Sequence, residues 1–461
     1  MKYINYIIPD VERPKKYLSL KERLYYTLIA LCLYFLLSAT PVYGISKQTA
    51  SRFEAILILL GAVHGSLITL GIGPIVTGVI VLELLVGAGI LPLDLNKEED
   101  RKKFRLLSKW FSLLFIILEN TIWVINGMLA PERPTAFMYG IVILQLIVGC
   151  ILLMILDDFV DNWGIGSGIS LFILAGVSAQ IFTQMFSFLP GPRGLPGGSF
   201  LRGIIFGIKG FALQALFSFM PFIAFIIILL LSVYTQGVRV EIPLTFGRLR
   251  GYSLTWPISF LYTSNIPVIF AAALLANMRI WALSLYNAGY PILGTFNRTL
   301  LPTGGYTDVP VSGVMYYLTP TPFYDAIIGR ISWSAWILKT LCYFAFMGIV
   351  CMLFAKLWIM IAPGQSPESV AGMILSSYLR IPGFRQEKKI VEKTISRYIN
   401  AVAILGGLFV GFLAALADIL GAPVRGTSIL LAAIIVLNYY EVIKRRYRKE
   451  IPKSVKKFLG I

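Results

Sequence analysis

The chain reads Leu70-Gly71-Ile72-Gly73-Pro74-Ile75-Val76 near the centre of an apolar run that extends from Ala55 to Leu93. The core of a bilayer is about 30 Å thick and needs only about 20 helical residues, so this run is too long for one span. Two glycines and a proline break it at a depth where unpaired backbone survives only against protein or beside a water-filled cavity. We therefore expect a half-helix, a Gly-Pro break and a second helix that completes the crossing. Taken alone, the segment fits a Pro-kinked helix packed against its neighbours equally well.

The composition is that of a membrane protein with many spans. Hydrophobic residues make up 57% of the 461 positions and charged residues only 14%, far from the balance of a soluble domain. The cysteines lie in apolar stretches without metal or redox spacing, so we expect buried thiols and no disulfides. The four cysteines are Cys32, Cys150, Cys342 and Cys351.

Ten segments have the length and hydropathy of a span. A half-length apolar piece at 54–66 precedes the second of them. An even number of spans places both ends of the chain on the same side of the membrane. The expected spans lie near 24–42, 73–91, 107–129, 136–156, 168–187, 212–234, 258–277, 338–360, 399–419 and 428–443.

The distribution of Lys and Arg predicts the orientation. Basic residues concentrate before the first span, after the second span, in the loops at 237–256 and 363–397, and in the tail from residue 444. Cytosolic loops carry the excess of Lys and Arg, so we expect a cell-membrane protein with both termini in the cytosol. This rule also accounts for most of the net charge of +18.

Both large cytosolic loops combine arginine with glycine. They read Gly247-Arg248-Leu249-Arg250-Gly251 and Gly383-Phe384-Arg385, the latter followed by Lys388 and Lys389. Glycine allows tight turns that project side chains, and the planar fork of arginine suits phosphate recognition. An RNA-rich partner such as a ribosome fits this pattern, and a solvated loop is the plainer alternative.

The sequence offers little chemistry for catalysis. His64 is the only histidine, which excludes a multi-histidine metal site. The triplet Gly166-Ser167-Gly168 resembles the surroundings of a serine nucleophile but lacks a base elsewhere in the chain. Asp157 and Asp158 stand at the cytosolic end of a span, where solvation explains them. We expect no enzyme, no cofactor and no metal.

Ionisable side chains inside spans are costly and usually face a partner or a cavity. Glu119, followed by Asn120, lies well inside the third span and is the best functional candidate, with a structural, hydrogen-bonded carboxyl as the alternative. Four other ionisable side chains lie within spans or near their ends, where each can reach the end of its span or a partner. These others are Glu83, Lys339, Lys356 and Asp418.

A second glycine-rich helix start, Gly164-Ile165-Gly166-Ser167-Gly168-Ile169, opens the fifth span. Ile72 and Val76 are four residues apart, as are Ile169 and Ile173, so each pair shares a helix face. Together with the broken backbone, this spacing predicts a constriction lined by aliphatic side chains, which can block ions by dewetting.

At this point a resemblance can be named. The stretch from Leu67 to Thr77 resembles the second span of the SecY family, the channel subunits of the Sec protein translocase, in its archaeal and eukaryotic form. Further motifs match in order, and the resemblance covers essentially the whole chain. They are the glycine-rich start at 164–169, Arg239-Val240-Glu241-Ile242-Pro243-Leu244, Ser264-Asn265-Ile266-Pro267-Val268-Ile269 and Pro291-Ile292-Leu293-Gly294.

The resemblance implies the roles of particular residues. Its pore ring matches Ile72, Val76, Ile169, Ile173, Ile269 and Leu431. Its plug matches the piece at 54–66, with Ala55, Ile56, Leu57, Ile58, Leu59, Leu60, Gly61 and His64. The polar cluster of its lateral gate matches Thr77, Glu119 and Asn277. Its ribosome-docking loops match Arg239, Arg248, Arg250, Arg385, Lys388 and Lys389.

The resemblance also implies an architecture and partners. We expect an all-α membrane protein of two inverted five-helix halves, 24–187 and 212–443, around a central pore. Residues 1–23 and the basic tail 444–461 lie in the cytosol, and an external loop at 188–211 is the hinge. The expected partners are a SecE-type gamma subunit, a small beta subunit, the ribosome, nascent polypeptides, signal peptides and lipid.

The expected function is therefore a protein-conducting channel that also releases transmembrane segments into lipid through a lateral gate. The chief alternative is a secondary transporter, because transporters also use inverted repeats and broken helices. Some positions depart from the family pattern. Glu83 stands where glutamine is usual, His64 replaces an arginine, and Ala422-Pro423-Val424-Arg425-Gly426 replaces a glycine-rich run. We predict that Glu83 is protonated or paired with a partner subunit.

Overall fold

Helices make up nearly all of the regular structure. The computed structural model describes residues 11–45, 65–87, 90–93, 98–125, 129, 131–188, 196–246, 253–263, 266–287, 289–300, 306–361, 366–377, 379–381, 387–447 and 450. Within these ranges nine helices are long and apolar enough to cross a membrane, and a shorter apolar helix completes the set at the position of the second expected span. The ten-span, all-helical membrane fold is therefore confirmed.

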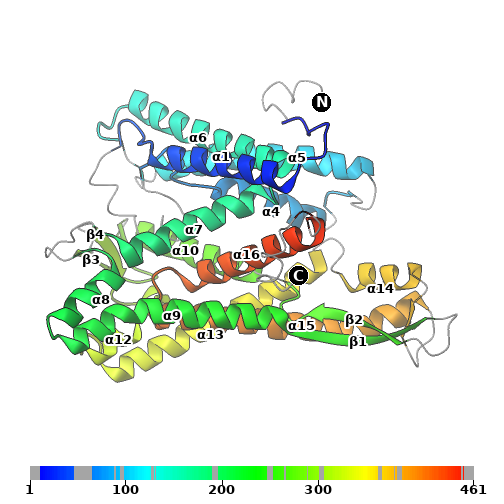
Figure 1. Ribbon diagram of the computed structural model, residues 1–461. Helices are drawn as coiled ribbons and strands as arrows, with labels where there is room; N and C mark the ends of the chain where they lie inside the picture. The colour runs from blue at the N-terminus through cyan, green and yellow to red at the C-terminus, as the bar shows by residue number, and fades with distance from the viewer. Residues whose placement is uncertain are drawn as a thin grey trace.

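The ten helices follow the expected order in two groups. In Figure 1, α1, α5 and α6 lie on one side, α9, α13 and α15 lie on the other, and α7 and α16 lie between them. The first group consists of α1 (Leu20–Ala39), α4 (Gly73–Gly87), α5 (Glu98–Ile125), α6 (Ala136–Trp163) and α7 (Gly168–Phe186). The second consists of α9 (Ala212–Gly237), α10 (Ile266–Asn287), α13 (Trp333–Ile361), α15 (Lys388–Ile419) and α16 (Gly426–Arg446).

The start of α1 shows how the sequence fixes a helix end. Ser19 accepts a hydrogen bond from the backbone N–H of Glu22, and the Glu22 carboxylate accepts one from the backbone N–H of Ser19. This reciprocal capping box satisfies two N–H groups that a helix start would otherwise leave unpaired. The N–H of Leu20 donates to the carboxylate of Glu450, so the first helix and the tail that follows the last helix lie at the same end of the molecule.

The connection that we expected as the loop 237–256 is a β-hairpin. Strand β1 (Arg239–Phe246) pairs antiparallel with β2 (Ser253–Ser259), from Arg239 opposite Ser259 to Thr245 opposite Ser253. Our prediction that the seventh span begins near residue 258 is therefore wrong, because those residues belong to β2 and α10 begins at Ile266. The apolar residues of β2 had extended the hydropathy signal toward the cytosolic side.

Two further connections also contain helices. The segment expected as the loop 188–211 includes α8 (Ser199–Ile208), and the segment 363–397 includes α14 (Pro367–Ser376). The helices α5 and α15 begin about two and a half and three turns earlier than the expected spans, at Glu98 and Lys388. Hydropathy detects only the part of a helix that lies in lipid, so it misses these charged extensions.

Small sheets lie at the two ends of the helix bundle. Strand β5 (Leu379–Arg380) pairs with the end of β1, which gives the sheet order β2-β1-β5. At the opposite end in Figure 1, β3 (Phe296–Leu300) and β4 (Tyr306–Pro310) form a second hairpin. Two short helices, α11 (Val314–Leu318) and α12 (Phe323–Ile327), follow it.

Small residues allow α13 and α15 of the second group to approach each other closely. A Cβ added at Gly411 of α15 would lie 2.6 Å from the carbonyl oxygen of Met347 in α13, and one added at Gly407 would lie 2.6 Å from the Cβ of Ala355. Met347 and Cys351 of α13 are almost completely buried at this contact. Such glycines are the usual means by which membrane helices approach one another, because lipid provides little hydrophobic drive.

Candidate functional site

The backbone break is present between Gly65 and Gly73. Residues 65–72 form a series of turns rather than a helix, and Gly71 has a left-handed φ of 58°. The N–H groups of Thr69, Gly71 and Gly73 bond to carbonyls three residues earlier, at 3.0, 2.8 and 3.3 Å. A single Pro-kinked helix is thus wrong for this segment, because α4 begins only after the break.

The break is shielded by α6 instead of lying open to lipid. The carbonyl of Leu67 rests directly on Gly149, where a Cβ would collide with it. The thiol of Cys150 is 4.0 Å from the carbonyl oxygen of Gly71. Ile68, Thr69 and Leu70 are all at most 2% exposed. Non-helical backbone at membrane depth is therefore covered by protein on this side, as lipid requires.

Four of the six expected ring residues share one apolar cluster. Ile72 is 7% exposed and belongs to a buried cluster with Ile75, Ile116 and Leu171. Val76, Ile169 and Ile173 are partly buried and pack against the same cluster. The end of the break and the start of α7 therefore border the same apolar cluster.

Leu431 lies at about the same depth as Ile173. The hydroxyl of Tyr439 in α16 donates to the carbonyl oxygen of Ser167 at 2.8 Å, which sets the register of α16 against α7. The rise of about 1.5 Å per residue then places Leu431 about 12 Å and Ile173 about 9 Å from this contact along the two helix axes. Ile269 is half-buried in the first turn of α10 and, within the described part of the chain, is not a member of the cluster.

The start of α7 is held by side chains from three other helices. Asp157 and Asp161 of α6 accept hydrogen bonds from the N–H groups of Ile169 and Gly168, at 2.6 and 2.9 Å. Gly166 has a φ of 72° and leaves no room for a Cβ beside the ring of Tyr439. The remaining two contacts come from α1. Arg23 donates to the carbonyl of Gly164 at 2.8 Å, and the hydroxyl of Thr27 accepts from the N–H of Ile165 at 3.1 Å.

This capping arrangement was missed from the sequence. Asp157 and Asp158 were interpreted as solvated, but Asp157 caps α7 and Asp158 forms a 2.5 Å ion pair with Lys109 of α5. The available signal was the group of acidic residues just before the glycine-rich start. That signal could not show which N–H groups the carboxylates reach, because the contact forms only when α6 and α7 pack together.

Two of the three expected gate residues lie together. The carboxyl of Glu119 in α5 lies near the hydroxyl of Thr77 in α4, and this hydroxyl donates to the carbonyl of Gly73 at 2.9 Å. The neighbouring Asn120 is fully buried and donates to the carbonyl of Ile116 at 2.7 Å. The third, Asn277, lies in α10, and its side chain is outside the described residues. Helix α4 also contacts α13, so helices of the two groups meet on this side.

The plug positions lie outside the described residues, as do half of the basic loop residues. These are Ala55 to Gly61, His64, Arg248, Arg250 and Arg385. The residues that follow the plug positions are described. The N–H of Leu67 donates to the carbonyl of Thr40 at 2.9 Å, and Ser66 pairs with Pro41, which ties the entrance of the break to the end of α1.

The remaining basic residues lie at one end of the bundle. Arg239 is exposed in β1, Lys389 is exposed at the start of α15, and Lys388 forms a 2.7 Å ion pair with Glu368. Since β5 joins β1 in one sheet, the two cytosolic loops that were expected to act together are physically connected.

These features define a class of protein, a polytopic helical membrane protein whose broken second span borders an apolar cluster that it shares with the start of α7. The SecY family model matches residues 66–440. The chain is 38% identical over 471 residues to the protein translocase subunit SecY of Pyrococcus furiosus, with 98% of this chain and 97% of that relative covered. The chain therefore belongs to the SecY family, and the match supports its archaeal-type form.

Solved structures agree with this membership. One, described as the structure of a protein conducting channel, has a TM-score of 0.74 at 37% identity and covers 98% of this chain and 99% of that chain. Sec61 in the canine ribosome–channel complex from the endoplasmic reticulum has a TM-score of 0.71 at 36% identity with the same coverage. The chain is thus a multi-pass membrane protein and a protein-conducting translocation channel, not an enzyme. The secondary-transporter alternative is excluded.

Proposed function

We propose that the collar of aliphatic residues is the point at which the channel both seals and conducts. Its members are Ile72, Val76, Ile169, Ile173, Ile269 and Leu431. A translocating polypeptide has an arbitrary sequence, so specific polar ligands along its path would retain some segments and reject others. Aliphatic side chains bind a passing backbone weakly, adapt to different side chains and exclude ions when the collar closes. The observation that carries this proposal is the shared cluster of Ile72, Val76, Ile169 and Ile173 at the broken backbone.

The lateral gate is proposed to open between α4 and α5 on one side and α10 and α13 on the other. The proximity of Thr77 to Glu119 and the contact of α4 with α13 support this position. A hydrophobic segment gains roughly 25 cal/mol for each Å² of apolar surface that it moves from water into lipid. A gate that opens toward lipid therefore sorts segments and signal peptides by their own hydrophobicity, without a chemical step.

We further propose that the segment at 54–66 is the plug and that α8 with its flanking residues, 188–211, is the hinge of the two halves. The end of the molecule that carries β1, β2, β5 and both terminal helices faces the cytosol, because the basic residues concentrate there. The solved Sec61 relative in a ribosome complex supports docking of a ribosome at the same end. A SecE-type gamma subunit and a small beta subunit complete the proposed complex.

Cross-linking to an arrested secretory chain tests the conducting path. A cysteine placed at Ile173 in the collar should form a disulfide with a cysteine in the middle of the arrested chain. A cysteine at Leu338, which is 50% exposed on α13, is the control and should not react. Equal reaction at both positions, or reaction at Leu338 alone, would show that the polypeptide does not pass through the collar.

A further inference from the structure

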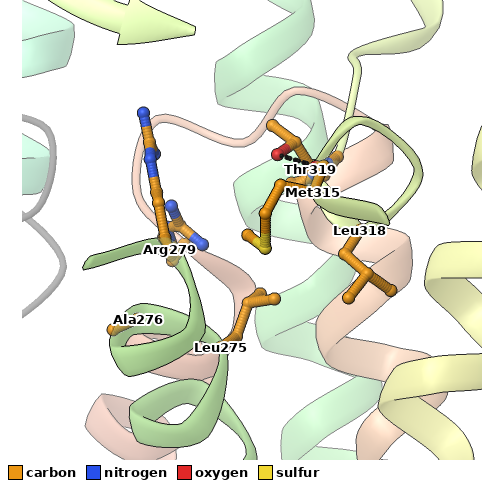
Figure 2. A pocket seen from close by; sticks show the side chains of 8 residues that line it. Leu275, Ala276, Arg279, Met315, Leu318 and Thr319 are labelled. Carbon is orange, nitrogen blue, oxygen red and sulfur yellow. Dashed lines mark hydrogen bonds between the residues drawn. The ribbon is translucent and has the colours of Figure 1, made fainter. Parts of the chain in front are cut away.

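A small cavity lies away from the collar, where the far end of α10 meets α11 and the turn before α16. Arg279, Met315 and Thr319 line it together with Arg425, and Leu275 and Leu318 cover its apolar side. Figure 2 shows the side chain of Arg279 on one side of this space, with Met315 and Leu318 across from it. This is the end of the molecule that carries the β3–β4 hairpin, opposite the basic cytosolic loops.

Two guanidinium groups of like charge share this cavity. Arg279 donates one hydrogen bond, to the carbonyl oxygen of Asp308 at 2.8 Å. Arg425 lies close enough to repel Arg279, while Asp308 attracts Arg279 and the buried carboxylate of Asp418 attracts Arg425. The guanidinium group of Arg425 makes no hydrogen bond and no ion pair within the part of the chain that the structure describes. The two guanidinium groups therefore keep unused N–H donors beside the cavity, which is costly where the surroundings are apolar.

The nearest acceptor groups are already committed to other partners. The carboxylate of Asp418 accepts from the hydroxyl of Tyr343 at 2.6 Å and from the N–H of Gly426 at 2.8 Å. The hydroxyl of Thr319 donates to the carbonyl of Met315 at 2.7 Å. Guanidinium groups can only donate, so the polar part of the cavity calls for an occupant that accepts from both arginines.

We propose that this cavity binds one small inorganic anion, of about the size of chloride, between Arg279 and Arg425. Its volume of about 20 Å³ is sufficient for a single water-sized occupant. An anion accepts from both guanidinium groups at once, whereas a water molecule must also place its own two hydrogens. The N-terminus of α16, at Gly426, adds further positive potential beside the site.

The bound anion ties three elements that are distant in sequence. Arg279 belongs to α10, Arg425 precedes α16, and the strand that carries Asp308 leads to α11. The anion thus stabilises the packing of this end of α10 against the turn before α16. Neither arginine stands in the collar or in the proposed gate cluster.

Anomalous diffraction from crystals of the purified channel grown in bromide tests the site directly. The expected result is one bromide peak between the two guanidinium groups. A water molecule at that position, without an anomalous peak, would overturn the proposal. This test needs only the unaltered chain.

Thermal unfolding of the same channel, with its co-purifying subunits, is the second measurement. Replacing chloride by gluconate at constant ionic strength should lower the Tm of the unaltered chain by at least about 2 °C. Arg425→Gln and, separately, Arg279→Lys should reduce this chloride dependence. Arg330→Gln should retain it, because Arg330 pairs with Asp325 outside the cavity. The proposal is overturned if the Tm does not depend on chloride, or if it depends on chloride equally in Arg425→Gln and in the unaltered chain. Any bromide peak would then reflect binding at crystal concentration only.

Discussion

At the scale of single residues, the backbone break depends on Gly71, because a residue with a Cβ would be strained at this position. Gly71 has a φ of 58°, where a side chain would approach the following carbonyl. Gly73, two residues later, begins α4, and a Cβ added there would meet nothing within 4 Å. Only Gly71 is therefore required by the backbone conformation, whereas Gly73 has room for a side chain. The sequence alone does not distinguish the two.

Replacing these two glycines by alanine should therefore give different results. Gly71→Ala should destabilise the break by about 1–2 kcal/mol, the cost of a left-handed conformation for a residue with a Cβ. Gly73→Ala should be neutral or slightly stabilising, because alanine favours the helix. Thermal unfolding of the purified variants checks this prediction, and an equal loss of stability for both would contradict it.

At the scale of elements, the start of α7 brings the two helix groups together beside the collar. Asp157 and Asp161 cap it from α6, and Tyr439 reaches it from α16. The residues 164–169 are therefore fixed on both sides before Ile169 and Ile173 enter the collar. We expect this arrangement to keep the collar narrow while the channel is closed.

Removing the cap should widen the collar. Asp157→Ala should cost about 1 kcal/mol or more, as the loss of a helix cap does, and should raise ion leakage through the closed channel. Asp157→Asn keeps a side-chain oxygen that can accept the N–H of Ile169 and serves as the control. Ion conductance in planar bilayers is the measurement. Unchanged leakage in Asp157→Ala would show that the cap does not determine the width of the collar.

Removing the link to α16 gives a related prediction. Tyr439→Phe loses the hydrogen bond to the carbonyl of Ser167, which is worth about 1 kcal/mol. If that bond exists only while the channel is closed, the open population should rise about fivefold. Tyr398→Phe, an exposed position of α15, is the control. Single-channel open probability should rise in the first variant and stay unchanged in the second; the opposite pattern would contradict the link.

The elements also show how far sequence reasoning extended. The broken backbone was predictable, because glycine and proline act locally. The hairpin of β1 and β2 was not, since its apolar residues extend the hydropathy signal of the next helix. The capping by Asp157 and the pairing of Arg279 with Arg425 depend on tertiary packing between distant segments, which no local pattern encodes.

At the scale of the whole molecule, the two loops that we propose to face the cytosol form one unit. Strand β5 pairs with the end of β1, so the connection before α10 and the connection before α15 share a sheet. The helices that start and end the chain lie at the same end, because Leu20 bonds to Glu450. The opposite end carries the second hairpin and the arginine cavity. This difference between the two ends of the molecule fits a channel that receives its substrate on one side of the membrane and delivers it on the other.

The shared sheet leads to a prediction about docking. Arg239→Glu and Lys389→Glu, both at exposed positions of this end, should each weaken ribosome binding and reduce its salt dependence, because each removes a contact to phosphate. Arg330→Glu, at the opposite end, should bind like the unaltered chain. Co-sedimentation of the purified channel with ribosomes over a range of salt concentrations checks this. Similar losses in all three variants would indicate a general charge effect instead.

The central claim is that a polypeptide passes through the aliphatic collar at the broken second span. The most direct measurement is an electron cryo-microscopy reconstruction of the channel holding an arrested secretory chain. We predict continuous density for that chain between Ile72 and Ile173, in contact with both side chains and with the residues of the break displaced around it. Density that runs outside the collar, with Ile72, Val76, Ile169 and Ile173 still packed together, would contradict the account.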